Sequence, residues 1–204
     1  MLENITMMDL KIMSLFVKDY TKTISIRQIT KSLDINYSHT FKRIKILVDE
    51  KILFQQKQGS MNMISVNIMN LKAVQLLSFV EEQESQKFKK NILRLMIIEM
   101  VVIDPSATLG IFGSQVSGNA TKNSDWDIFI ITQQVKQMKK IMSRFPYETQ
   151  IDLSVFSMEE FQESLKSPEE TVVKHIIRNK QIIYNPHPFY NAIRILEKIK
   201  YAPN

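Results

Sequence analysis

The stretch GIFGSQVSGNATKNSDWDIFI, residues 110–130, decides how the second half of the chain is interpreted. Gly113 and Gly118 are two of only four glycines in 204 residues, and both fall within six positions. Asp125 and Asp127 follow, separated by one residue, and lead into the apolar run IFII. Side chains alternate along a strand, so both carboxylates are expected on the same face. Like charges at that spacing oppose folding unless a positive group lies between them.

A strand that ends in Gly113-Ser114 and turns into a helix is typical of an anion site, because backbone N–H groups and the positive helix end face the ligand. Glycine also lets a phosphate approach the backbone closely. Asp125 and Asp127 are ligands of the type that divalent cations prefer. Asp152, in the later strand run TQIDLSVFS, is expected to supply a third carboxylate. Three carboxylates can hold two Mg²⁺ ions about 3.5–4 Å apart and clamp a phosphoryl displacement.

The same residues also have structural interpretations, which the sequence leaves open. Asp125 and Asp127 could be solubilising charges at a strand edge, and Asp152 could be a structural surface charge. Trp126, the only tryptophan, points to the other face of the strand and is expected to anchor the core. Four basic side chains either steady a triphosphate or are simply solvated: Lys122, Lys139, Lys140 and Arg144.

The order of these residues resembles the G-S-x-x-x-G-x(n)-S-D-x-D signature of the DNA polymerase beta nucleotidyltransferase superfamily, especially its minimal prokaryotic members. The similarity covers roughly residues 90–204, and Asp152 corresponds to the strand that carries the third carboxylate. Many minimal members have an arginine just before the second glycine, where this chain has Ser117. That departure bears on acceptor choice, nucleotide grip and activity. The matching positions are Gly113, Ser114, Gly118, Ser124, Asp125 and Asp127.

The resemblance implies transfer of a nucleoside monophosphate from a nucleoside triphosphate to an acceptor, with release of pyrophosphate. Gly113, Ser114, Gly118 and Ser124 would bind the nucleotide. Asp125, Asp127 and Asp152 would be the catalytic residues and would bind Mg²⁺ or Mn²⁺. The acceptor stays open between a protein side chain, an RNA end and a small molecule such as an aminoglycoside.

The rest of the second half has an α/β pattern. Apolar runs predict strands at SATLGIFGS, SDWDIFII, TQIDLSVFS and IIY. Periodic apolar residues predict helices at QQVKQMKKIMSRF, SMEEFQESL, VVKHIIRNK and PFYNAIRILEKIKY, and Ser157 with Glu160 forms a capping box.

The first seventy residues have a different order of elements. Helical periodicity covers residues 5–20, Ser25 and Gln28 form a capping box before IRQITKSL, and a third helix covers SHTFKRIKILVDEKI. Residues 52–56 and 63–68 then read as two strands, and the intervening Gly-Ser pair is a hairpin signal. Helices followed by a two-stranded hairpin are typical of a winged helix-turn-helix.

The third helix places Phe41, Ile44, Leu47 and Val48 on one apolar stripe, which we expect to face the core. The opposite face would carry residue types that reach phosphates and base edges of DNA. A solvated helix face, or a module that contacts protein, would give the same pattern. The predicted DNA-binding residues are Ser38, His39, Lys42, Arg43 and Lys45.

Composition narrows the class of protein. The chain has no cysteine, which excludes disulfides and thiolate zinc sites, and its three histidines show no metal-ligand spacing. The longest apolar run, residues 93–103, is about half a membrane span and carries two charges. Net charge is +6, and residues 1–70 contain ten Lys/Arg against six Asp/Glu. We expect a cytoplasmic protein that does not act at a membrane, with a mild basic excess that permits nucleic-acid binding.

These observations predict an α+β protein: an N-terminal winged helix-turn-helix over residues 1–70, a connecting helix over 71–90, and a small mixed-sheet α/β nucleotidyltransferase domain over 91–204. This arrangement resembles prokaryotic transcriptional regulators that carry a fused nucleotidyltransferase domain. The leading hypothesis is a DNA-binding regulator with an active transferase. The alternatives are an inactive nucleotide-sensing transcription factor and an antitoxin-like nucleotidyltransferase that acts on a partner toxin. Double-stranded DNA, nucleotide and a second copy of the chain are the expected partners.

Overall fold

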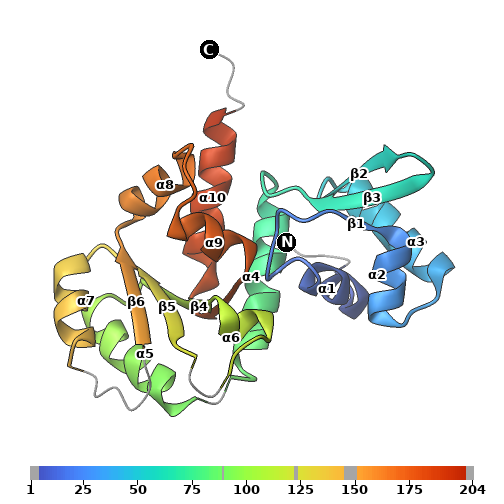
Figure 1. Cartoon of the computed structure of the whole chain (residues 1–204). Helices are drawn as coiled ribbons and strands as arrows, with labels where there is room; N and C mark the ends of the chain where they lie inside the picture. The colour runs from blue at the N-terminus through green and yellow to red at the C-terminus, as the bar shows by residue number, and fades with distance from the viewer. Residues whose placement is uncertain (1–4, 89, 122–123, 145–150, 201–204) are drawn as a thin grey trace.

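A computed structural model describes residues 5–88, 90–121, 124–144 and 151–200 (Figure 1). The described residues form a mixed α+β structure with a three-stranded and a four-stranded sheet. Each sheet belongs to one lobe, and helix α4, Leu71–Ser85, lies between the lobes. No helix in the described part of the chain is long and apolar enough to span a bilayer.

The N-terminal lobe consists of three helices and a small antiparallel sheet in the order β1-β3-β2. Side-chain caps set its helix starts. The Ser25–Gln28 capping box confirms the prediction, and Thr6 and Asp9 form a second box that was not predicted. Gly59, at φ 60°, turns the hairpin. The elements are α1 (Met7–Ser14), β1 (Ile24–Ser25), α2 (Ile26–Leu33), α3 (Tyr37–Asp49), β2 (Leu53–Gln58) and β3 (Met61–Val66).

Two expectations for this lobe are wrong. The first helix ends at Ser14, well before residue 20. Phe41 does not face the core: it is exposed and stacks on Tyr37 with ring centroids 6.2 Å apart. Thr40 is buried instead, and its hydroxyl donates to the carbonyl of Asn36. A threonine that satisfies its hydroxyl on the preceding turn can take a core position that apolar periodicity alone assigns to its neighbour.

The second lobe is built on a sheet in the order β6-β5-β4-β7, in which only the β5–β6 pair is parallel. Helices cover both of its faces (Figure 1). The elements are α5 (Asn91–Ile103), β4 (Thr108–Phe112), α6 (Ser114–Ser117), β5 (Trp126–Ile131), α7 (Val135–Met142), β6 (Ile151–Phe156), α8 (Met158–Lys166), α9 (Val172–Arg178), β7 (Lys180–Tyr184) and α10 (Pro186–Lys200).

Strand alternation divides the core of this lobe in two, as the sequence predicts. Ile128 and Ile130 pack on one face against α5 and α7. Phe129 packs on the other face against Phe112 and Phe189. Trp126 lies on the α5 side of the sheet, edge-on to Phe88 with ring centroids 5.9 Å apart. It packs against the core cluster on this face, as expected of a core anchor. Asp127 consequently lies on the Phe129 face of the sheet.

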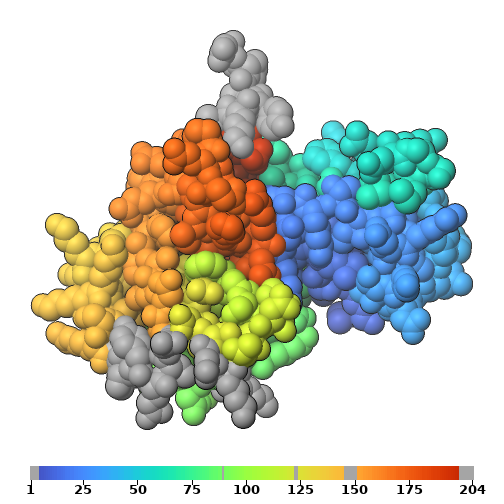
Figure 2. Space-filling view, viewed as in Figure 1, coloured from blue at the N-terminus to red at the C-terminus, as the bar shows by residue number. Residues whose placement is uncertain are grey.

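A buried ion pair joins the two lobes through α4. Lys180, fully buried at the start of β7, donates to the Glu81 carboxylate of α4 at 2.9 and 3.2 Å and to the Tyr190 hydroxyl at 2.8 Å. The same ammonium donates to the carbonyl of Val17 in the N-terminal lobe. Burial lowers the pKa of Lys180, and the Glu81 charge opposes that shift. Figure 2 shows the N-terminal lobe in contact with the second lobe.

We predict that Lys180→Met destabilises the protein by about 3–5 kcal/mol, because it leaves the Glu81 carboxylate buried without its cation. Urea denaturation measures this loss. The matched control is Lys72→Met, which breaks the half-exposed pair with Glu50 at 3.0 Å and should cost about 0–1 kcal/mol. Adding Glu81→Gln to Lys180→Met should recover part of the loss. Equal losses in Lys180→Met and Lys72→Met would contradict this role of the pair.

Candidate active site

Gly113 ends β4 in a backbone conformation that side chains avoid, with φ 70° and ψ −144°. A Cβ atom at this position would lie 2.0 Å from Oδ2 of Asp127. The Asp127 carboxylate therefore occupies the space directly over the Gly113 backbone. Glycine is required here for two independent reasons, the backbone angles and the packed carboxylate.

The turn after Gly113 is the single-turn helix α6. The N–H groups of its last two residues, Val116 and Ser117, donate to the Gly113 carbonyl at 3.2 and 3.1 Å. Gly118, at φ 80°, ends it in the left-handed conformation. Helix α6 has only four residues, so its dipole is weaker than that of the longer helix expected after Gly113-Ser114. Anion binding at this turn would therefore depend on local N–H groups.

Two residues that sequence reasoning missed hold this turn from outside. Asn179, just after α9, donates its side-chain amide to the Gly113 carbonyl at 3.0 Å. Lys18, from the N-terminal lobe, donates to the Val116 carbonyl at 3.1 Å. Neither lies in a local motif, and they are 66 and 98 positions away from their partners. Only the tertiary structure brings them together.

Ser124 closes a turn before β5. Its hydroxyl accepts from the Thr121 N–H at 2.8 Å and lies 3.1 Å from the Thr121 hydroxyl. Its carbonyl accepts from the Gln115 side chain at 3.5 Å. These contacts position the segment that leads to Asp125, and the predicted contact of Ser124 with nucleotide stays a prediction. Lys122 lies outside the described residues.

The three predicted carboxylates lie at one end of the sheet. Asp127 and Asp152 are direct partners in the register of parallel strands β5 and β6 and therefore share a face. Asp125 and Asp152 are exposed, whereas Asp127 is partly buried. Burial raises the pKa of Asp127, and the charges of Asp152 and Asp125 raise it further. Asp127 is thus close enough to Asp125 and Asp152 for their charges to act on it.

This donor set fits a hard divalent cation by chemistry, because carboxylate oxygens are its preferred ligands and the mutual repulsion favours added positive charge. The carboxylates do not converge on a single point: across residues 5–88, 90–121, 124–144 and 151–200, no group of three Asp, Glu, His or Cys side chains is arranged as a metal site. Asp125, Asp127 and Asp152 are the residues that would hold a metal ion here.

The basic residues of α7 are separated from this site. Met138 and Met142 pack α7 onto the face of the sheet opposite Asp127. The Lys139 and Lys140 side chains on this helix are exposed to solvent. Their solvated interpretation therefore fits the structure better than a contact with triphosphate at Asp127.

The third helix presents most, but not all, of the predicted DNA-binding side chains to solvent. Ser38, His39, Lys42 and Lys45 are exposed. Arg43 is the exception, because its guanidinium pairs with the fully buried Asp9 of α1 through Nε at 3.0 Å and Nη2 at 2.5 Å. Arg43 is thus committed to packing within the lobe, which corrects its assignment to the exposed face.

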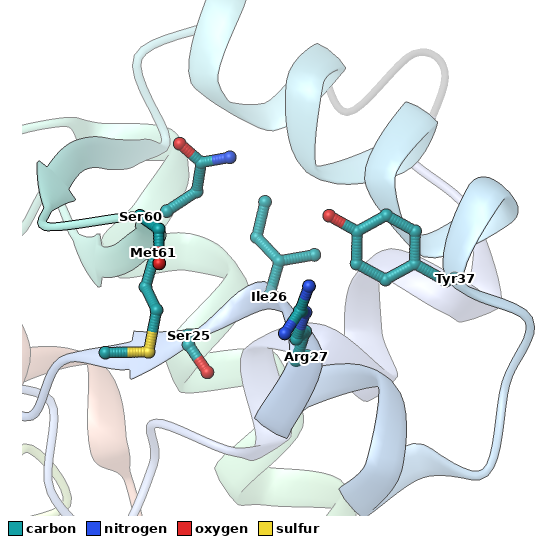
Figure 3. Close-up of a pocket in the computed structure, with 7 residues that line it drawn as sticks. Ser25, Ile26, Arg27, Tyr37, Ser60 and Met61 are labelled. Carbon is teal, nitrogen blue, oxygen red and sulfur yellow. The ribbon is translucent and has the colours of Figure 1, made fainter.

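A small pocket of about 60 Å³ lies beside this helix, between the start of α2 and the hairpin turn. Figure 3 shows the side chains of Arg27 and Tyr37 at this pocket, opposite Ser60 and Met61. Arg27 is exposed and adds a cation to this face of the lobe, beside the residues predicted to bind DNA.

Comparison with known proteins supports a nucleotidyltransferase domain in the second lobe. The family model described as polymerase beta, nucleotidyltransferase matches residues 106–188. The matched segment begins before β4 and ends in α10, so it contains Gly113 and the three carboxylates at Asp125, Asp127 and Asp152. No curated protein and no solved structure gave a match.

We predict that Gly113→Ala destabilises the protein more than Gly59→Ala does. Both positions have positive φ, but a Cβ at Gly59 meets nothing within 4 Å. Forcing an alanine into this positive-φ backbone conformation should cost about 1–3 kcal/mol of stability at each position. Gly113→Ala must also displace the Asp127 carboxylate. Thermal denaturation of both variants checks this, and equal losses would show that Asp127 does not occupy the space over Gly113.

Proposed function

We propose that the chain is a cytoplasmic, DNA-binding regulator whose second lobe is a Mg²⁺-dependent nucleotidyltransferase. In this proposal residues 1–70 are a winged helix-turn-helix, residues 71–90 the connecting segment whose helical part, α4, ends at Ser85, and residues 91–204 the transferase domain. The observation that carries the proposal is the packing of Asp127 over Gly113, in register with Asp152. The family match over residues 106–188 supports it.

The proposed reaction transfers a nucleoside monophosphate. The acceptor oxygen attacks the α-phosphorus of a nucleoside triphosphate, the bond from that phosphorus to the α–β bridging oxygen breaks, and pyrophosphate leaves. Bound Mg²⁺ or Mn²⁺ would neutralise the charge that develops on the attacking and leaving oxygens. Gly113, Ser114 and Gly118 would orient the triphosphate, and exposed Asp152 would accept the acceptor's proton.

The acceptor is chosen by the surface around this site. Ser117 occupies the position where many members of the family have an arginine, and it is exposed. Its hydroxyl donates to the Ser114 carbonyl at 3.2 Å and adds no charge there. A protein side chain, an RNA end and a small molecule therefore remain the acceptor classes to test.

The proposal for the N-terminal lobe rests on its element order and surface. Three helices are followed by an antiparallel hairpin whose second strand also pairs with β1. Lys42 and Lys45 on α3 and Arg27 on α2 are exposed cations on this lobe. Such side chains contact phosphates when a helix of this kind enters the major groove.

One observation favours the nucleotide-sensing alternative. Lys18 of the N-terminal lobe contacts Val116, three residues after Gly113. The turn proposed to bind nucleotide is therefore in direct contact with the lobe proposed to bind DNA. If nucleotide binds this turn with different affinity in two arrangements of the lobes, it would change the affinity for DNA. DNA would then change the affinity for nucleotide by the same factor.

We predict that Mg²⁺ plus a nucleoside triphosphate raises the melting temperature, because ligands that bind only the folded state stabilise it. The Asp125→Asn/Asp127→Asn double variant should lose that shift.

Asp152→Ala should retain nucleotide binding and reduce transfer of labelled nucleotide by about 100-fold or more. The protein itself and cell extract serve as acceptors, with each of ATP, GTP, CTP and UTP. Nucleotide-dependent DNA affinity without transfer in the natural protein would favour the sensor.

The corrected position of Arg43 separates two neighbouring residues on α3. Lys42→Ala should weaken DNA binding and reduce the slope of log K against log salt by about one, through loss of a phosphate contact. Arg43→Ala should leave that slope unchanged and destabilise the fold by about 3–5 kcal/mol, because Asp9 stays buried without its partner. Mobility shifts at several salt concentrations, on the upstream region of the gene, measure the slopes. Unchanged binding in Lys42→Ala would oppose a role of α3 in contacting DNA.

A further inference from the structure

Helix α5 has an apolar strip on its outer face that is exposed in the described part of the chain. Its inner face is buried in the core through Leu93, Met96 and Met100. Leu95, Ile98 and Val102 are instead 52, 58 and 81% exposed. The helix lies on the outside of the second lobe, beside α7 (Figure 1).

The spacing of the exposed residues is that of a coiled-coil seam. Leu95, Ile98 and Val102 follow one another by three and then four residues, which corresponds to positions a, d and a of a heptad. Asn91, one turn earlier, takes the preceding d position. The strip therefore has the pattern with which one helix packs along another, and scattered surface leucines do not produce it.

Charges at the edges of the strip indicate which helix it would accept. Arg94 takes position g and Glu99 the following e position, so they flank the strip on opposite sides, and both are exposed. Within the described residues neither side chain is in an ion pair. In a parallel pair of identical helices, g of one chain meets e of the other. Each Arg94 would then meet the Glu99 of the second copy, twice by symmetry.

We propose that two copies of this chain associate through α5, in parallel, around the seam of Leu95, Ile98 and Val102. A twofold interface must be self-complementary, and this strip meets that condition in both shape and charge. An antiparallel pair would place Arg94 beside Arg94 and Glu99 beside Glu99, which the like charges oppose. The seam is about two turns long, so the dimer is weak and depends on protein concentration.

Sedimentation velocity over a concentration series tests the association with the full chain. The natural protein should shift from 23.9 kDa toward twice that mass as its concentration rises. Ile98→Asp should raise the dissociation constant by about tenfold or more, because it buries a carboxylate in the seam. Leu71→Asp, at a leucine that is 48% exposed on α4, is the matched control and should leave association unchanged. Circular dichroism verifies that each variant is folded.

Charge exchange tests the pairing itself. Arg94→Glu alone and Glu99→Arg alone should each weaken self-association, because each places like charges across the seam. Mixing the two variants in equal amounts should restore a dimer of one chain of each kind. Because the chain has no cysteine, Asn91→Cys introduces the only thiol, and a parallel seam places it beside its own copy. Mild oxidation should then give a covalent dimer.

Three results would overturn the proposal. The first is a natural protein that stays monomeric at every concentration, which would leave the strip to a different protein. The second is a dimer that Ile98→Asp does not weaken. The third is a dimer in which Asn91→Cys gives no covalent product, which would contradict the parallel orientation. None of these readouts depends on nucleotide or DNA.

Discussion

The Asp127 carboxylate over the Gly113 backbone is the contact around which the second lobe is arranged. Burial raises the pKa of this group, and the charges of Asp152 and Asp125 add to that effect. A raised pKa in the folded state means that ionised Asp127 opposes folding, and this cost develops as pH rises through the ordinary range of aspartate and persists at neutral pH. The chain accepts this cost at one end of the sheet, beside the apolar Phe129 and Phe112. A divalent cation at the carboxylates would offset it, so the same repulsion that weakens the fold would favour metal binding.

Support for this strained site comes from distant segments. Asn179 holds the Gly113 carbonyl, Lys18 holds the Val116 carbonyl, and Lys180 pairs in register with Phe112, the residue before Gly113. Lys180 is also the cation that Glu81 of α4 requires. The turn, the central helix and the N-terminal lobe thus share one set of polar contacts, each of which would be costly to break because its groups are partly or fully buried. Such contacts fix the relation between the lobes more firmly than surface charges could.

The sequence alone correctly predicted the features that depend on neighbouring residues, such as strand alternation and helix capping. Strand alternation placed Trp126 and Asp127 on opposite faces, and the Ser25–Gln28 capping box gave the start of α2. The position of Asp152 beside Asp127 followed from the resemblance and agrees with the strand register. Residues whose environment depends on a distant partner could not be read in this way. In the sequence Arg43 fits a DNA contact, but in the structure it pairs with the buried Asp9. Phe41 has the spacing of a core residue, but Thr40 is the residue that is buried. The supports at Asn179 and Lys18 have no sequence signal, because a single hydrogen bond to a carbonyl leaves no pattern along the chain.

The sheet keeps the proposed surfaces of the second lobe apart. Ile128 and Ile130 face α5, whereas Asp127, the residue before Ile128, faces the opposite side. A dimer that forms through the outer face of α5 would therefore leave the carboxylates of both copies accessible, since the whole thickness of the helix and the sheet lies between the seam and the site. The N-terminal lobes join the second lobes through α4 and β7, and α5 takes no part in the polar contacts of that junction. Association of two copies would then double the number of lobes proposed to bind DNA, without disturbing the contact between Lys18 and the turn after Gly113. The coupling proposed between nucleotide and DNA would depend, in each copy, on its own lobe junction. The proposed dimer would act on DNA affinity through the number of lobes engaged.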